Sequence, residues 1–254
     1  MDYRDLNSDA WDEEVKRNNY WTRIASKEEI DNARDGDVHI RVSPMKYVPL
    51  EWISGTKGKD VLLLAGGGGQ QTPILASLGA VVTTLDNSQN QLNQDKIALS
   101  RFDLSAKLIK GSMDNIELPD DSFDYVINPV SINFIDCPER VFKEVNRVLR
   151  KDGTFIFGVA NPVLYLFDEK LQEKKLKIKY TLPFSDETAK SEKEKKEMIK
   201  HRDTFEFSHT LDSLIGGLLR SGFIIDGFYS DGADSEPTDS YIYDSYLVFK
   251  ARKI

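Results

Sequence analysis

Aliphatic runs alternate with amphipathic helical segments through the middle of the chain. Val61–Ala65 is a continuous apolar run, as expected for a strand covered on both faces, and Val81–Leu85 is a second β-rich run. Further strands are predicted at residues 107–110, 123–127, 154–159, 223–229 and 241–251, and helices at about 74–78, 89–101, 141–149 and 211–219. This alternation predicts right-handed βαβ crossovers, and therefore an α/β protein with a doubly wound, mostly parallel sheet of seven strands.

Two segments lie outside this rhythm. Residues 9–35 predict two helices, the first capped by Asp9 and carrying Trp11, the second beginning at the capping box of Ser26. Residues 164–202 are rich in Lys and Glu, which is typical of a solvated helix or a lid. We therefore predict a helical arm and lead-in over residues 1–57 and a main domain over 58–254, with a charged insertion at about 162–207.

Composition narrows the class of protein. The 254 residues include 34 Lys and Arg against 42 Asp and Glu, a formal net charge of −8, which argues against broad binding to nucleic-acid backbones. The acidic N-terminus fits no signal or transit peptide, and no apolar run approaches the roughly 20 residues of a membrane helix. Cys137 is the one cysteine, so neither an intramolecular disulfide nor a metal-ligand spacing is available. We predict a cytoplasmic protein without a metal or membrane contact.

Four consecutive glycines, Gly66–Gly69, follow the first predicted strand and precede a helix. Glycines at such a junction let the chain turn tightly and let helix N–H groups meet a ligand. The G-x-G-x-x-G dinucleotide fingerprint fails, because its last position falls on Gln71 or Thr72. The chain contains no G-x-x-x-x-G-K-[ST] phosphate loop either. A dinucleotide or nucleoside triphosphate is therefore disfavoured.

An acidic residue, Asp86, ends the second predicted strand. In doubly wound folds a carboxylate at this place accepts hydrogen bonds from ribose hydroxyls. A plain helix N-cap is the alternative, but Asn87 and Ser88 already offer caps. Residues 111–114 follow the third strand and form either a simple turn or part of the same site. The pattern indicates a nucleoside ligand.

These features together resemble a class I S-adenosylmethionine-dependent methyltransferase with a type-11 methyltransferase domain. The resemblance rests on the glycine loop, Asp86, Ser112-Met113-Asp114, the segment LPDDSFD at residues 118–124 and the helix and turn at 141–153. It spans about residues 58–160, with weaker similarity over 208–251. It implies the Rossmann-like methyltransferase fold, with S-adenosylmethionine as cofactor and S-adenosylhomocysteine as product.

The resemblance also implies which residues bind the cofactor. They are Ala65, Gly66, Gly67 and Gly68 around the methionine portion, Asp86, Asn87 and Gln91 at the ribose and adenine, Met113 and Asp114 at the adenine, and Asn128 and Pro129 beside the sulfonium and the acceptor. Asp86 would hold the ribose hydroxyls. Asp114 would accept from the adenine amino group, while Met113 packs on the ring.

Two positions depart from the family pattern of an acidic residue, one position and G-x-G-x-G. Leu63 stands where the acid is usual, and Ala65 stands where the first glycine is usual. The missing carboxylate removes one anchor near the methionine end. Gln70, Gln71 or a residue of the N-terminal arm is the candidate replacement.

No catalytic residue is predicted, because methyl transfer from a sulfonium needs a general base only when the acceptor loses a proton early. His209 lies where the insertion meets a helix, so it is a candidate for either the substrate site or a helix cap. Trp11, Tyr20 and Trp21 either pack the arm onto the core or close over the sulfonium by a cation–π contact.

The leading hypothesis is a cytoplasmic methyltransferase that transfers a methyl group from S-adenosylmethionine to a small-molecule acceptor by in-line displacement. One alternative is an RNA or protein methyltransferase with the Lys-rich insertion as docking surface, although the net charge of −8 argues against RNA. The other is a non-catalytic regulator that binds S-adenosylmethionine or S-adenosylhomocysteine, motivated by Leu63 and Ala65.

Overall fold

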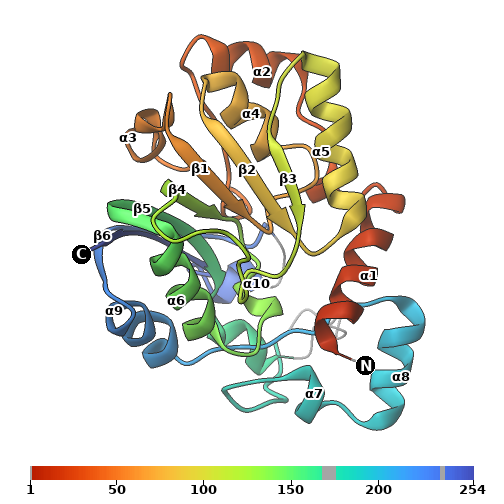
Figure 1. Ribbon diagram of the computed structural model, residues 1–254. Helices are drawn as coiled ribbons and strands as arrows, with labels where there is room; N and C mark the ends of the chain where they lie inside the picture. Colours follow the sequence, from red (N-terminus) through yellow and green to blue (C-terminus); the bar gives the residue numbers. More distant parts are fainter. Residues whose placement is uncertain (1, 168–175, 235–237) are drawn as a thin grey trace.

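A seven-stranded sheet forms the centre of the computed structural model, which describes residues 2–167, 176–234 and 238–254 (Figure 1). The strand order is β3-β2-β1-β4-β5-β7-β6, and only β7 runs antiparallel to its neighbours. The strands are β1 (Asp60–Leu64), β2 (Val81–Asp86), β3 (Lys107–Lys110), β4 (Phe123–Asn128), β5 (Leu149–Ala160), β6 (Phe223–Asp231) and β7 (Tyr246–Lys253). The predicted doubly wound, mostly parallel α/β sheet is confirmed.

Helices cover both faces of this sheet and its carboxyl edge. They are α1 (Tyr3–Lys16), α2 (Lys27–Arg34), α3 (Leu50–Ile53), α4 (Gln71–Leu78), α5 (Gln89–Phe102), α6 (Pro138–Val148), α7 (Asp186–Ala189), α8 (Glu192–His201), α9 (Gly217–Arg220) and α10 (Thr238–Tyr241). Short 3₁₀ turns are η1 (Tyr20–Thr22), η2 (Ser54–Thr56), η3 (Ile132–Phe134) and η4 (Pro162–Leu166). No helix of the described ranges is long and apolar enough to cross a membrane.

The strand β1 shows why the middle of the chain is so apolar. Leu62 and Leu64 belong to the core that includes α6 and α9, whereas Val61 and Leu63 belong to the opposite core, which includes α2 and α4. All four side chains are fully buried. Alternate residues of a strand point to opposite faces, so a strand covered on both faces must be apolar throughout.

The N-terminal arm differs from its prediction at its start. Helix α1 begins at Tyr3, and Asp2 caps it by accepting a hydrogen bond from the backbone N–H of Arg4, so Asp9 is inside the helix. The capping box of Ser26 with Glu29 at the start of α2 is present as predicted. Trp21 lies in the short turn η1 rather than in a long helix. The arm therefore bends twice before it reaches the sheet.

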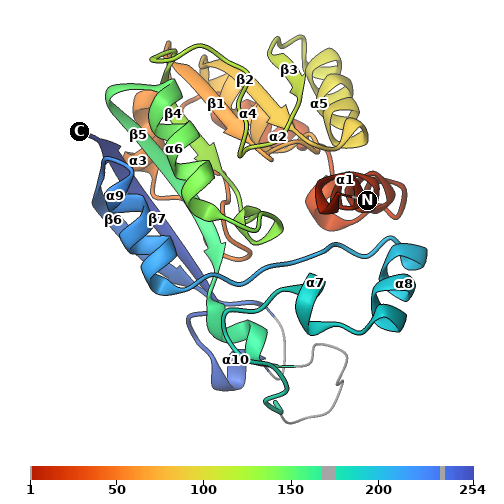
Figure 2. The same cartoon turned by 60° about the horizontal axis from the view of Figure 1, so that its bottom comes forward.

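The insertion after β5 packs against the arm instead of standing alone in solvent. Met198 of α8 is buried with Tyr3 of α1 and with Phe205 and Phe207, which follow α8. Figure 2 shows α7 and α8 on the side of the molecule that α1 also occupies. Most charged residues of α8 are exposed, as predicted for a solvated helix, but the buried Met198 packs α8 against α1. Residues 168–175 of the predicted insertion lie outside the described residues.

Three details near the C-terminus also differ from the prediction. The helix expected at 211–219 contains a π-helical turn, Asp212–Gly216, before α9. A π turn shifts the residues that follow around the helix axis, so Leu214 and Leu218 are buried while Leu211 and Leu219 are exposed. The strand expected from Tyr241 begins at Tyr246, because α10 ends at Tyr241 and residues 242–245 form a loop. Residues 235–237 of the acidic loop lie outside the described residues.

Candidate functional site

The first half of the glycine loop folds over the end of β2. The Gly67 N–H donates to Asp86 Oδ2 at 3.0 Å, and the Ala65 N–H donates to the Leu85 carbonyl at 2.8 Å. A Cβ on Gly67 would lie 2.8 Å from Gln91 Cβ and 2.9 Å from Asp86 Oδ2. Position 67 therefore requires glycine, because a Cβ there would clash with its neighbours. Ala65 adopts a left-handed φ of 47°, although it lacks the conformational freedom of glycine.

The second half of the loop receives the N-terminal arm. A Cβ on Gly68 would lie 2.9 Å from the Trp21 carbonyl, and the Gly69 carbonyl accepts from the Ala25 N–H at 2.7 Å. The Gly69 N–H donates to Asp95 Oδ1 at 2.9 Å. Gly68 and Gly69 therefore allow the N-terminal arm to pack against the loop. Sequence alone does not distinguish this role from ligand binding.

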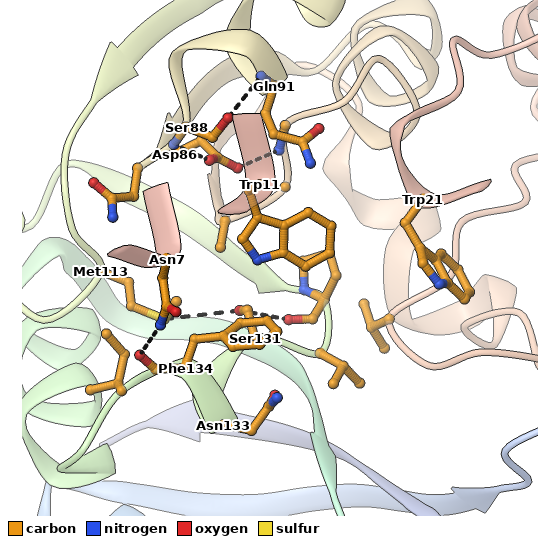
Figure 3. Close-up of a pocket in the computed structure, with 18 of the residues that line it drawn as sticks. Asn7, Trp11, Trp21, Asp86, Ser88, Gln91, Met113, Ser131, Asn133 and Phe134 are labelled. Carbon is orange, nitrogen blue, oxygen red and sulfur yellow. Dashed lines mark hydrogen bonds between the residues drawn. The ribbon is translucent and has the colours of Figure 1, made fainter. Parts of the chain in front are cut away.

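A cavity of about 320 Å³ opens at the carboxyl ends of β1, β2 and β4, and we call it the inner cavity. Its walls come from the glycine loop, the turns after β2 to β4, α1 and the lead-in at residues 41–44 (Figure 3). Of the predicted cofactor residues, those that line it are Ala65, Gly66, Gly67, Asp86, Asn87, Gln91, Met113 and Pro129. Gly68, Asp114 and Asn128 are not among the lining residues. The structure thus brings most of the predicted residues to one place.

Asp86 is the charged centre of the inner cavity's β2 side. Its carboxylate accepts hydrogen bonds from the N–H groups of Gly67 and Ser88, the latter at 2.8 Å. Burial raises the pKa of Asp86 to about 6, against the opposing effect of these hydrogen bonds. A carboxylate offers about four lone-pair positions, so two remain for further donors. Such a group favours a ligand that brings hydroxyl donors.

Asn128 holds the sheet together instead of facing the cavity. Its fully buried amide Nδ2 donates to the Leu64 carbonyl and to Ser131 Oγ, each at 2.7 Å. The first bond joins β4 to the end of β1, directly before the glycine loop. Asn128 therefore fixes the floor of the site, and its buried partner Ser131 is the one of the two that lines the cavity.

Asp114 is occupied by the N-terminal arm. Arg4 forms an ion pair with its carboxylate, and Ser112 Oγ donates to it as well. Burial by itself would raise the pKa of Asp114, but the hydrogen bonds from Arg4 and Ser112 hold that pKa below its usual range. Arg4, rather than Asp114, lines the inner cavity. The arm thus covers the position that the resemblance assigned to the adenine.

Helix α1 is also bonded to the turn after β2. Ser8 Oγ donates to the Asn87 carbonyl at 2.8 Å, and Asn87 Nδ2 donates to the Arg4 carbonyl at 2.6 Å. Asp12 accepts from the Asn90 N–H at 2.9 Å. These bonds place Trp11 at the cavity, between Asp86 and Phe134 as drawn in Figure 3. Trp21 also lines the cavity, but the half-exposed Tyr20 does not.

Four lining residues carry buried polar atoms without a hydrogen-bond partner: Gln91 Oε1, Arg41 Nε, Ser43 Oγ and Asn133 Oδ1. Buried polar groups are normally paired, so such atoms in a cavity indicate a polar ligand. They lie on three different sides, in α5, in the lead-in and in η3. A ligand that satisfies all four atoms must span the cavity.

Arg41 is the functional candidate that sequence reasoning missed. Its Nη1 donates to Tyr20 Oη at 2.8 Å and its guanidinium lies 4.4 Å from the Tyr47 ring centre, yet no carboxylate of the described residues pairs with it. It stands near the altered glycine loop, where Gln71 Nε2 donates to the Arg41 carbonyl at 3.1 Å. No motif marks Arg41, because its placement depends on how the lead-in crosses the sheet.

The other candidate residues lie away from the inner cavity. Gln70 points to the arm, where its Nε2 donates to the Tyr20 carbonyl at 2.9 Å. His209 is buried beside the Ile132 carbonyl, burial lowers its pKa, and it lines neither this cavity nor the one described below. Leu63, in place of the usual acid, is fully buried in the core. No cluster that could hold a metal ion occurs within the described parts of the chain.

Known proteins that resemble this chain share its fold and family. A family profile described as "Methyltransferase domain" matches residues 62–157. The methyltransferase YbaJ of Bacillus subtilis (strain 168) is 43% identical over 220 residues, covering 86% of both chains. The S-adenosylmethionine-dependent methyltransferase structures from Mesorhizobium loti and Methanosarcina mazei align with TM-scores of 0.62 and 0.55, each at 19% identity, over 78% and 77% of this chain and 92% of each of theirs. The chain therefore belongs to the S-adenosylmethionine-dependent methyltransferase family.

Proposed function

We propose that this enzyme transfers a methyl group from S-adenosylmethionine, the cofactor of its family, to a small-molecule acceptor. The observation that carries the proposal is the inner cavity, where the glycine loop and Asp86 face four unpartnered polar atoms from other elements. Its volume of about 320 Å³ lies in the usual range for small-ligand sites. When bound, the cofactor supplies an electrophilic methyl group on a sulfonium.

The residues of the cavity fit the parts of this cofactor. Asp86 would accept from the ribose hydroxyls, and Gln91 Oε1 would gain the donor that it lacks. Met113 would pack against the adenine, whose other edge would meet Arg4, because Arg4 covers Asp114.

The methionine end of the cofactor carries a carboxylate and an ammonium group. Arg41, whose charge has no carboxylate partner among the described residues, would bind that carboxylate from the side opposite the glycine loop. Arg41 would thus give the methionine end an ionic contact in a site where Leu63 stands at the position of the usual acid. Trp11 and Trp21 would exclude water from the sulfonium.

The charges of the insertion favour a small acceptor over RNA or a protein. Lys195 pairs with Glu192 at 2.5 Å and Lys200 pairs with Glu197 at 3.5 Å, so two α8 lysines are balanced within their own helix. The net charge of −8 acts in the same direction. We also propose a cytoplasmic location, and we propose residues 1–57 and 162–207 as additions that cover the site.

Calorimetric titration with S-adenosylhomocysteine tests the cofactor site. Asp86→Ala should lower affinity by roughly 100-fold, because two charge-assisted hydrogen bonds are lost. Asp120→Ala, an exposed carboxylate outside the cavity, is the matched control and should bind as wild type does. No binding to wild type would contradict the proposal, and so would equal binding to wild type and Asp86→Ala.

The same titration has an expected pH dependence. The folded-state pKa of Asp86 is raised to about 6, so its charged form, which accepts from ribose, is lost as pH falls through 6. The affinity of wild type should therefore drop by roughly tenfold between pH 8 and pH 5. Asp86→Asn should be weak at both values and show no such change.

A further inference from the structure

A second cavity adjoins the inner one, and we call it the outer cavity. It measures about 460 Å³ and lies between α1, η4 and the insertion, with Arg17, Phe184 and Met198 among its lining residues. Five residues line both cavities: Trp11, Phe134, Leu164, Tyr165 and Glu206. A molecule in the outer cavity would therefore meet the inner cavity across a wall made by these five side chains.

Most of that shared wall consists of aromatic rings. Trp11 and Phe134 pack edge to face with ring centres 5.7 Å apart. Tyr165 stacks on Phe184 of the outer cavity at 5.6 Å. Flat apolar surfaces of this kind suit a ligand that contains a planar ring.

Glu206 is the single carboxylate that the described linings of both cavities share. Its Oε2 accepts from Tyr165 Oη at 2.6 Å and from Asn133 Nδ2 at 3.3 Å. The Glu206 N–H donates to Asp186 Oδ2 at 2.9 Å, and its carbonyl accepts from the Asp186 N–H at 3.0 Å. Side chains from η3 and η4 and the backbone of α7 thus hold one carboxylate at the junction.

The N-terminal arm holds Phe205, the residue before Glu206, in place. Asn7 of α1 accepts from the Phe205 N–H at 2.6 Å and donates to the Phe205 carbonyl at 3.0 Å. The backbone N–H and carbonyl of Phe205 are therefore both hydrogen-bonded to the Asn7 side chain, as they would be to a neighbouring strand in a sheet. The position of Glu206 therefore depends on both additions to the core fold, the arm and the insertion.

The described residues that line the outer cavity carry no large excess of one charge. Arg17 pairs with Glu14 at 2.8 Å, and Lys190 lies 3.8 Å from Asp186. A highly charged acceptor such as a phosphate ester would need an excess of cations. An acceptor without strong charge fits these walls better.

We propose that the outer cavity holds the acceptor, a small ring-containing molecule with an ionisable hydroxyl, and that Glu206 takes the proton of that hydroxyl. This inference rests on the proposed function. The hydroxyl oxygen forms the new bond to the methyl carbon, the carbon–sulfur bond breaks with its electron pair staying on sulfur, and the hydroxyl proton moves to the Glu206 carboxylate. A methyl ether, a thioether and a neutral carboxyl result, so atoms and charges balance.

The test uses the full chain and a protein-free small-molecule extract of the cells that make it. Transfer of tritium from methyl-labelled S-adenosylmethionine reports turnover, and native mass spectrometry of the protein with S-adenosylhomocysteine reports retained acceptor without turnover. Glu206→Gln should lower transfer by roughly 10²- to 10⁴-fold while retaining both ligands. Glu206→Asp should restore part of the rate. Asp120→Asn, an exposed carboxylate outside both cavities, is the matched control and should stay within about twofold of wild type.

A blocking variant tests the cavity separately from the carboxylate. Asp203→Trp, at an exposed position that lines the outer cavity alone, should abolish retention of the acceptor and leave the affinity for S-adenosylhomocysteine unchanged, which also shows that the variant folds. Equal rates for Glu206→Gln and Asp120→Asn would overturn the inference, as would a labelled product whose new methyl group is not bonded to a hydroxyl-derived oxygen. Failure of wild type to bind S-adenosylhomocysteine would instead contradict the proposed function.

Discussion

The two sides of the inner cavity are built in different ways. The sheet side consists of short turns at strand ends, and it offers backbone groups and one acid, Asp86. The cover consists of the arm and lead-in, and it offers long side chains, Arg4, Trp11 and Arg41. The parallel strands fix the turns, whereas hydrogen bonds and one ion pair hold the cover in place.

This difference separates two tasks. Backbone groups at the ends of buried strands cannot shift without disturbing the core, so the sheet side suits a cofactor whose structure is constant. The cover touches the core through Asn87, Asn90 and Asp114, and its side chains can change without altering the sheet. The sheet side therefore determines that the site binds a nucleoside. The cover supplies the side chains that compensate for this chain's altered glycine loop and that suit its acceptor.

The largest effect is expected from adding one methyl group to the glycine loop, on the sheet side of the inner cavity. Gly67→Ala puts a Cβ within 3 Å of Gln91 and Asp86, so affinity for S-adenosylhomocysteine should fall by roughly 100-fold or more. Gly111→Ala is the control on the same cavity, because its Cβ would meet Leu85 at an ordinary 3.4 Å. Calorimetry that finds equal losses for the two variants would show that the sheet side is not rigid.

A smaller and more selective effect is expected from the cover. Arg41→Gln should weaken S-adenosylhomocysteine binding by roughly 10- to 100-fold, because a charge-assisted contact to the methionine carboxylate is lost. Binding of 5′-methylthioadenosine, which lacks the amino-acid portion, should not change. Arg41→Lys keeps the charge, so its affinity for S-adenosylhomocysteine should lie between those of wild type and Arg41→Gln. If both ligands weaken equally in calorimetry, Arg41 supports the fold of the lead-in rather than the carboxylate.

The smallest effect concerns stability. Ala65→Gly relieves a left-handed φ of 47° and should raise the free energy of unfolding by about 0.5–1 kcal/mol, after the entropic cost of glycine. Ala160→Gly, a cavity residue in strand β5 without a positive φ, should lower it by a similar amount. Urea denaturation measures both. A destabilised Ala65→Gly variant would mean that the Ala65 methyl group contributes more by packing than its backbone costs.

Local patterns predicted the sheet side well. Two-sided burial makes strands such as β1 continuous apolar runs, and an acid that ends a strand lies at the carboxyl edge whatever the distant chain does. The family resemblance and the methyltransferase assignment were correct for the same reason, since they rest on residues 58–160, where neighbours in sequence determine the geometry.

The cover could not be predicted in the same way. The start of α1 at Tyr3 depends on its packing with Met198, almost two hundred residues away, and the π turn at 212–216 is invisible to a 3.6-residue periodicity. The role of Asn128 as a tie between β4 and β1 depends on a carbonyl in another strand.

Sequence by itself determined the order of strands and helices, the glycine loop and the carboxylate at the end of β2, because each follows from local periodicity and short motifs. Only the tertiary structure decided that Gly68 and Gly69 hold the arm, that Arg4 covers Asp114, and that Arg41 and Glu206 reach the cavities. These placements join segments far apart in the chain. They are set by packing and by side-chain hydrogen bonds between elements, which no local pattern encodes.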